Sequence, residues 1–132
     1  MAGEEIVRYL LHMWNYSMCV PLDPSSAFDL VVNDGEDWIT IQIKHSKLNY
    51  LPLTREAKLN GIRIKKGYKK GDFDYLFACQ FPYIYIVPWS QMKSHTRFNF
   101  KKHEEYRHDL TDISTYTNKV NLEKEENERV IN

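Results

Sequence analysis

The N-terminal segment carries apolar side chains at helical spacing. These positions recur every three or four residues and would form one stripe along a helix. They are Ile6, Val7, Leu10, Leu11 and Trp14. The spacing predicts a helix over residues 3–14, with its apolar stripe packed against a core.

Shorter apolar runs separated by turn residues follow, which is typical of strands. Residues 18–22 predict a first strand, and residues 27–32 and 38–44 predict two more, joined as a hairpin by Asp34-Gly35. Alternation in the third strand would place one set of side chains on a core and the other on a polar face. The polar set is Trp38, Thr40, Gln42 and Lys44, and the apolar set is Ile39, Ile41 and Ile43.

The rest of the chain predicts further strands and short helices. Residues 73–80 and 83–87 are apolar and aromatic, and each predicts a strand. The polar, basic residues 46–68 predict an excursion of short strands and loops. Three predictions cover the C-terminal part: one helical turn at 89–93, a short strand at 97–100 and helix within 103–118.

These elements predict an α/β fold in which helices flank a central sheet. A chain of 132 residues has the length of one domain. We assign that domain to residues 1–118. The highly charged residues 119–132 predict a terminal helix or a disordered tail.

Composition points to an intracellular protein, cytoplasmic or associated with DNA, rather than a secreted one. No apolar run approaches the roughly 20 residues that cross a membrane. The N-terminus is acidic, whereas a signal peptide begins with basic residues. Cys19 and Cys79 both lie in apolar stretches and are interpreted as buried free thiols in a reducing compartment.

Charge is unevenly distributed along a chain whose net charge is zero. Residues 1–37 contain seven acids and one base, whereas residues 44–70 contain nine bases and one acid. A local basic segment is typical of phosphate binding, although it also occurs as a solvated surface loop. The candidate DNA-binding residues are Lys47, Arg55, Lys58, Arg63, Lys65, Lys66, Lys69 and Lys70.

The predicted hairpin would bring Asp29 close to Gln42 and Lys44. A carboxylate within an apolar strand is costly unless it is paired or binds a metal ion. Taken singly, Asp29 could cap a loop, Lys44 could be a surface lysine, and Gln42 could lie on a solvated face. Taken together, the three side chains predict a site on one face of the hairpin.

Glu4 is a fourth candidate, because helical spacing aligns it with Val7, Leu11 and Trp14 at the border of the apolar stripe. An acid in the first turn of a helix is also favourable for electrostatic reasons alone.

Phosphodiester hydrolysis is the chemistry that needs such a set. Mg²⁺ prefers oxygen ligands, usually one or two carboxylates with water and phosphate oxygens. Asp29 would be the main ligand, helped by the Gln42 amide oxygen and the Ile43 carbonyl oxygen. Lys44 would orient or activate the attacking water and balance charge in the transition state. Glu4 would hold a water of the metal ion, and Mn²⁺ could replace Mg²⁺.

These residues resemble the PD-(D/E)xK nuclease superfamily. Its pattern is an acid on the first helix, an aspartate that begins the second motif, and (D/E)-x-K on the next strand. Here the pattern is similar at Glu4, Asp29 and Gln42-Ile43-Lys44. Phe28 stands where the family has proline, and Gln42 replaces the second acid, which removes one negative metal ligand.

Within the superfamily, the sequence is similar to the intron-encoded homing endonucleases of cyanobacterial type. The similarity continues at residues 72–76 and 85–90 and covers residues 3–97. It implies a restriction-endonuclease-like core with a central mixed sheet. It also implies a Mg²⁺-dependent, site-specific endonuclease of double-stranded DNA that works as a homodimer or homotetramer.

Two alternatives remain at this point. A Holliday-junction or structure-selective nuclease shares the same core pattern. A non-catalytic DNA-binding or assembly module would explain Gln42 as a mark of lost metal binding. Zinc ligation is disfavoured because the histidines are unevenly spaced with no cysteine pairs nearby, and no glycine-rich phosphate loop is present.

Overall fold

The structure is a computed structural model that describes residues 2–124. It begins with helix α1 (Ala2–Met13), as the apolar spacing predicts. Val7 and Leu11 on the stripe of this helix are completely buried. Asn15 takes a left-handed φ of 63°, which ends the helix and turns the chain into the sheet.

A mixed sheet of six strands forms the centre of the molecule, in the order β1-β2-β3-β7-β8-β10. Neighbouring strands are antiparallel except β3 and β7, which are parallel. The α/β class and the central mixed sheet are therefore confirmed. The strands are β1 (Ser17–Cys19), β2 (Leu30–Asn33), β3 (Trp38–His45), β7 (Tyr75–Gln80), β8 (Tyr83–Pro88) and β10 (Arg107–Asp109).

Both faces of this sheet are covered, so two cores form. Helix α1 packs on one face, where Ile39 and Ile41 of β3 and Phe77 of β7 join its apolar stripe. Leu76 and Ala78 alternate to the opposite face and pack in the second core. Two-sided burial explains why β7 is an almost continuous apolar run.

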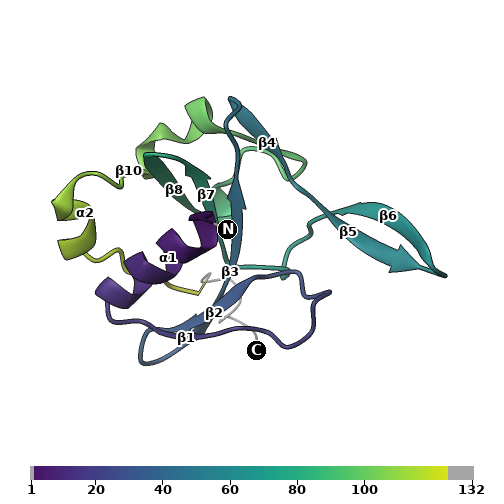
Figure 1. Ribbon diagram of the computed structural model, residues 1–132, viewed down its shortest axis with the longest axis horizontal. Helices are drawn as coiled ribbons and strands as arrows, with labels where there is room; N and C mark the ends of the chain where they lie inside the picture. The colour runs from purple at the N-terminus through teal and green to yellow at the C-terminus, as the bar shows by residue number, and fades with distance from the viewer. Residues whose placement is uncertain (1, 125–132) are drawn as a thin grey trace.

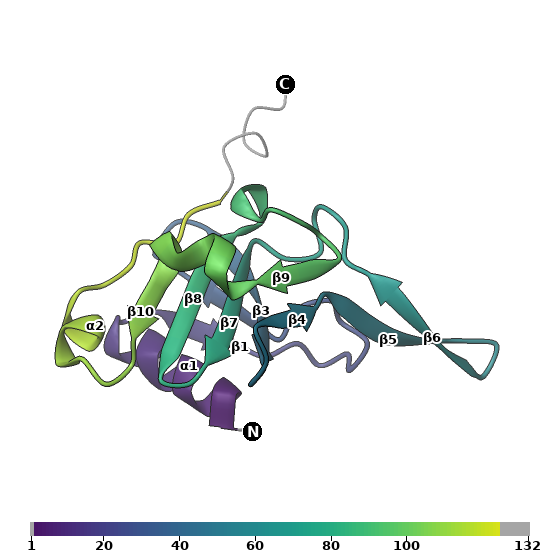
Figure 2. The same cartoon turned by 90° about the horizontal axis from the view of Figure 1, so that it is seen from above.

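The connection from β3 to β7 contains three strands, as the basic segment predicts in outline. Strand β4 (Tyr50–Pro52) pairs with β9 (Arg97–Asn99). Among the strands of residues 2–124, β5 (Thr54–Leu59) and β6 (Ile62–Gly67) pair only with each other. The β5–β6 hairpin projects from the side of the molecule away from α2, and both views show it standing clear of the central sheet (Figures 1 and 2).

The C-terminal third differs in part from the prediction. The helical turn at 89–93 and the short strand at 97–100 are present as 3₁₀ helix η1 (Trp89–Gln91) and β9. The helix predicted within 103–118 is partly wrong. That region holds the end of 3₁₀ helix η2 (Phe100–Tyr106), then β10, then the short helix α2 (Ile113–Thr117). Residues 107–109 are extended because their backbone completes the edge of β8.

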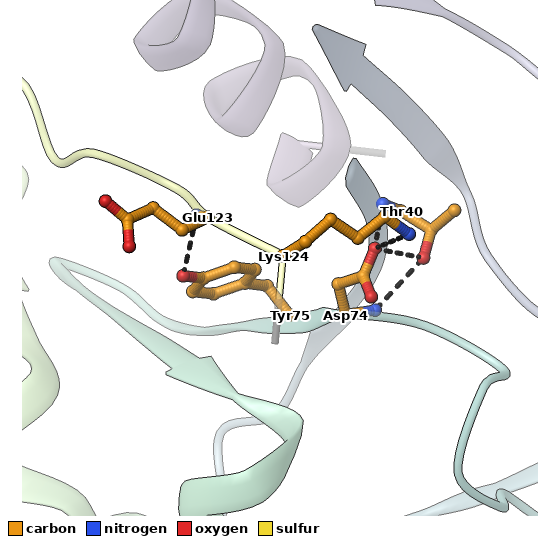
Figure 3. A network of polar contacts seen from close by, with 5 residues as sticks. All are labelled: Thr40, Asp74, Tyr75, Glu123 and Lys124. Carbon is orange, nitrogen blue, oxygen red and sulfur yellow. Dashed lines mark hydrogen bonds and ion pairs between the residues drawn. The ribbon is translucent and has the colours of Figure 1, made fainter. Parts of the chain in front are cut away.

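Residues 119–124 run along the sheet and are held by contacts with Tyr16, Tyr75 and Asp74. Tyr16 Oη accepts from the Leu122 N–H and donates to the Val120 carbonyl, each at 2.9 Å. Lys124 Nζ lies 3.0 Å from Oδ2 of the buried Asp74, as Figure 3 shows. The remainder of the predicted tail, residues 125–132, lies outside the described residues.

Both cysteines are free, but only Cys79 is buried. The expectation of burial is wrong for Cys19, because β1 is a short edge strand in which only the middle residue, Met18, is half-buried. Within residues 2–124, no helix is long and apolar enough to cross a membrane.

Candidate active site

Asp29 lies just before β2, where the β2–β3 pairing ends. Its backbone N–H donates to the Ile41 carbonyl at 2.8 Å. Its side-chain carboxylate then provides the hydrogen-bond acceptor that a backbone carbonyl would provide if the strand continued: Oδ2 accepts a hydrogen bond from the Ile43 N–H at 2.8 Å. The same oxygen accepts from Gln42 Nε2 at 2.8 Å. Among the described residues, Oδ1 has no hydrogen-bond partner and remains available to a ligand.

Gln42 is buried and holds the carboxylate in place. Its amide nitrogen donates to Asp29 and, at 3.3 Å, to the Ile43 carbonyl. The structure therefore shows Gln42 as a hydrogen-bond donor within the cluster. A role for its amide oxygen, or for the Ile43 carbonyl, as a metal ligand stays a prediction.

Lys44 enters the same site from the polar face of β3, as the alternation predicts. Its Nζ donates to the Thr54 carbonyl at 2.9 Å and lies 5.4 Å from the centre of the Tyr68 ring. Both contacts come from the β3–β7 connection, which closes over the end of the strand. They restrict the ammonium group to the neighbourhood of Asp29.

Glu4 is half-buried on the first turn of α1, beside the apolar stripe as predicted. Its Oε1 lies 3.8 Å from an Arg8 guanidinium nitrogen, an exposed pair of the kind that adds little stability. Glu4 is near enough to Asp29 for its negative charge to act on that carboxyl. The helix and the hairpin therefore bring two acids to one region.

Burial dominates the electrostatics of this cluster. Burial raises the pKa of Asp29 above its ordinary value, and the negative charge of Glu4 raises it further. The hydrogen bond from the Ile43 N–H and the positive charge of Lys44 lower this pKa and so oppose the shift. Burial also lowers the pKa of Lys44, against the attraction of Asp29. Both charged groups are thus held where water solvates them poorly. A divalent cation and a phosphate would compensate for this loss.

A pocket of about 340 Å³ gives access to the cluster. Asp29, Gln42 and Lys44 line it, together with the loop at 24–26 and residues from the β3–β7 connection. Sequence reasoning missed Thr54 and Tyr68, which reach the pocket only through the path of that connection. Burial raises the pKa of Tyr68 to about 12, with the Asp29 charge adding to the effect.

The donor set fits Mg²⁺ or Mn²⁺ better than zinc. Within the described part of the chain, no group of three His, Cys, Asp or Glu side chains is placed to hold a metal ion. Asp29 nevertheless presents an oxygen with no hydrogen bond in the described structure, and carbonyl oxygens of Gln42 and Ile43 belong to the same cluster. One carboxylate with neutral oxygens and water is a usual Mg²⁺ environment.

The predicted DNA-binding residues fall into three places. Lys69 and Lys70 are exposed in the loop after β6. Lys47 lines a separate, largely apolar pocket beside Gly3 and Phe81. The other five lie on the projecting hairpin: Arg55, Lys58, Arg63, Lys65 and Lys66. No contact in the structure tests their role in binding, which stays a prediction.

Comparison with known proteins assigns the family and the fold of this chain. The sequence matches the family described as PD-(D/E)XK endonuclease over residues 2–122. The chain therefore belongs to the PD-(D/E)XK endonuclease family. No curated protein sequence matches it.

Solved structures that are similar to the chain include the following two. The bacterial homing endonuclease I-Ssp6803I is 17% identical with a TM-score of 0.58, over 74% of this chain and 72% of that one. The Holliday junction resolvase Hjc of Archaeoglobus fulgidus is 14% identical with a TM-score of 0.47, over 82% and 98%. The first supports the fold, and the similarity to homing endonucleases predicted from the sequence is confirmed.

Proposed function

We propose that the protein is a Mg²⁺-dependent endonuclease that hydrolyses phosphodiester bonds of double-stranded DNA at a defined site. One observation carries this proposal. The Asp29 carboxylate, with one oxygen open to a ligand, and the Lys44 ammonium line the same pocket. Family membership supports the reaction type, and the resemblance to homing endonucleases motivates the site-specific substrate.

Each residue of the cluster has a distinct part in this mechanism. Asp29 would hold the divalent ion while the Ile43 N–H and the Gln42 amide fix its Oδ2. Lys44, held by the Thr54 carbonyl, places a positive charge beside the scissile phosphate, where negative charge accumulates in the transition state. Glu4, whose negative charge acts on Asp29, would accept a hydrogen bond from a water of the ion.

Asp29 would hold the divalent ion, with the Gln42 and Ile43 oxygens as further donors. When bound, the ion supplies Lewis-acid stabilisation and lowers the pKa of an attacking water. The chain's own contribution is to orient these donors. The buried Gln42 and the backbone of β3 fix them before any ligand arrives.

The cut also requires a second copy of the chain. One pocket can hydrolyse one strand, so a double-strand break needs two copies, usually related by a two-fold axis. A homodimer or homotetramer satisfies this requirement. The exposed lysines of the basic segment would contact backbone phosphates on either side of the cut.

The test is cleavage of supercoiled plasmid and of a synthetic four-way junction, each with Mg²⁺, with Mn²⁺ or with EDTA. We expect metal-dependent nicking or linearisation of plasmid by the wild type. Lys44→Ala should lose it. Lys101→Ala, which removes an exposed lysine from η2, is the matched control and should retain it.

The substrate separates the proposal from its alternatives. Preferential cutting of the four-way junction would favour a Holliday-junction or structure-selective nuclease over a site-specific endonuclease. DNA binding that persists with no cleavage and no metal binding would support the non-catalytic module. Metal-dependent cleavage that survives Lys44→Ala would refute the assignment of the active site.

A further inference from the structure

The tip of the β5–β6 hairpin exposes two large apolar side chains. Leu59 and Ile62 are cross-strand partners on either side of the turn, with exposed fractions of 60% and 66%. The turn between them is Asn60-Gly61, with left-handed φ angles of 52° and 80°. This is the tight two-residue turn that matches the twist of paired strands, so the tip is narrow and well defined.

Strand register gives the hairpin two chemically different faces. Cross-strand partners share a face, so Lys58 and Arg63 lie together, as do Glu56 and Lys65. An ion pair of 3.6 Å between Glu56 and Arg63 agrees with this arrangement. On the other face, Leu59 and Ile62 continue into Ile64, which is half-buried. The apolar tip therefore has basic side chains directly behind it.

The root of the hairpin is tied to the active-site pocket. The Thr54 carbonyl accepts from Lys44, and an Arg55 guanidinium nitrogen donates to the Ser25 carbonyl at 2.9 Å. Arg55 lies on the same face of the hairpin as Leu59. From Arg55 to Leu59 the strand advances four residues, about 13 Å at the rise of an extended chain. The tip is thus held at a set reach from the pocket.

We propose that Leu59 and Ile62 form a wedge that inserts between base pairs of bound double-stranded DNA, partly unstacking and bending it. This inference rests on the proposed function and extends it to how the target is recognised. Two observations select DNA as the occupant. The side chains of Lys58, Arg63 and Lys65 complement phosphates beside the tip. A β-ribbon is also narrow enough to enter a groove of the duplex.

Insertion of apolar side chains from a basic element is a general way to kink DNA. It would give this protein sequence selectivity without base-specific hydrogen bonds, because pyrimidine–purine steps unstack most easily. The reach of about 13 Å corresponds to roughly four base steps at 3.4 Å each. Cut sites should therefore favour such a step within about four base pairs of the scissile phosphate.

Plasmid unwinding tests the wedge without knowledge of the target sequence. Wild-type protein is mixed with closed plasmid in EDTA, which prevents metal-dependent cleavage. Topoisomerase I then relaxes the plasmid, and topoisomers are separated after the protein is removed. Binding to a short random duplex is followed by fluorescence anisotropy, so unwinding can be expressed per bound molecule.

We expect the wild type to lower the linking number in proportion to its occupancy. The double variant Leu59→Ala with Ile62→Ala should lose most of this unwinding while its affinity falls only about fivefold, because phosphate contacts dominate binding. The matched control, Lys58→Ala with Arg63→Ala, should bind more weakly but retain the unwinding per bound molecule.

Three outcomes would overturn the wedge. One is DNA binding by the wild type with no change in linking number, which leaves the proposed function intact. Another is equal unwinding by the wild type and the apolar double variant. A third is a smaller assembly for that double variant in light scattering, which would make a second copy of the chain the occupant of the tip. Absence of any DNA binding would refute the proposed function together with the wedge.

Discussion

Asp29→Asn should separate the metal site from the stability of the fold. Asparagine has the same shape and keeps an oxygen that can accept from the Ile43 N–H and the Gln42 amide. The variant therefore removes the charge and leaves the local hydrogen bonds. Cleavage should fall about 10³-fold or more, because loss of the carboxylate ligand removes several kcal/mol of charge stabilisation.

Without metal, the same change should favour folding near neutral pH. Burial raises the pKa of Asp29 above the ordinary value of 3.8, so the folded protein holds this proton more tightly than the unfolded chain does. The tighter binding of this proton stabilises the folded wild type fully at pH values below the ordinary pKa of 3.8. That stabilisation is lost as pH rises through the raised pKa of the folded state. The melting temperature of Asp29→Asn, relative to the wild type, should therefore increase between about pH 4 and pH 7.

Mg²⁺ should stabilise the wild type more than Asp29→Asn. At a free concentration ten times its Kd, an ion that binds only the folded state stabilises by about 1.4 kcal/mol. If the variant binds tenfold more weakly, the gain is about 0.4 kcal/mol. For a domain of this length each kcal/mol shifts Tm by about 3–6 °C, so the wild type should gain roughly 4 °C more than the variant.

Differential scanning fluorimetry at several pH values, with and without Mg²⁺, measures both effects without a DNA substrate. Asp112→Asn is the matched control, since asparagine serves equally well at the N-cap of α2. The reasoning fails if Mg²⁺ raises the Tm of Asp29→Asn as much as that of the wild type. It also fails if the Tm difference in EDTA decreases as pH rises.

Three further predictions concern the charges around this site and the C-terminal segment. Lys44→Met should slow cleavage by about 10²–10³-fold. Lys44 acts as a cation, and burial lowers its pKa below the ordinary value of 10.5. The cleavage rate of the wild type should therefore begin to fall at a pH below 10.5. A rate that still rises up to pH 10.5 would contradict this prediction. Removing three exposed lysines should weaken DNA affinity and reduce the slope of log K against log salt by up to about 2.7, whereas an unchanged slope would place the DNA elsewhere. These are Lys58, Lys65 and Lys69. Lys124→Ala should lower the free energy of unfolding by about 1.5–3 kcal/mol in urea titrations, because Asp74 is buried and loses a charged partner at 3.0 Å. An unchanged urea midpoint would show that this pair contributes nothing.

Local patterns predicted the central part of the fold well. Helix α1 follows from the spacing of Val7, Leu11 and Trp14, and its observed bounds agree within a residue. Strand β3 follows from strict alternation, since the isoleucines must face a core. A turn at Asp34-Gly35 then fixes which residues of the hairpin lie together. For that reason the amino-acid sequence alone was enough to predict that Asp29, Gln42 and Lys44 lie close together, and they line one pocket.

Elements whose conformation depends on distant partners could not be predicted in this way. Residues 107–109 are polar and carry no strand signal, but the free edge of β8 makes them β10. Tyr68 and Thr54 reach the pocket only because the β3–β7 connection folds back over β3. Tyr68 lies among lysines in the sequence, and only its aromatic character could have indicated burial. Cys19 is exposed because β1 is an edge strand, which its apolar neighbours do not reveal.

Gln42 is the departure that most affects the mechanism, and its environment explains how a neutral residue can work there. A second carboxylate at 2.8 Å from Asp29, in a buried position, would force the two groups to share a proton or to wait for a cation. The amide donates a hydrogen bond to Asp29 Oδ2 instead, which orients the carboxylate before metal binds. The cluster then has the acid Asp29 and the base Lys44 lining one pocket, with the charge of Glu4 near enough to act on Asp29. We expect weaker metal affinity than a three-acid site would have, together with a carboxylate that is already oriented when the ion arrives.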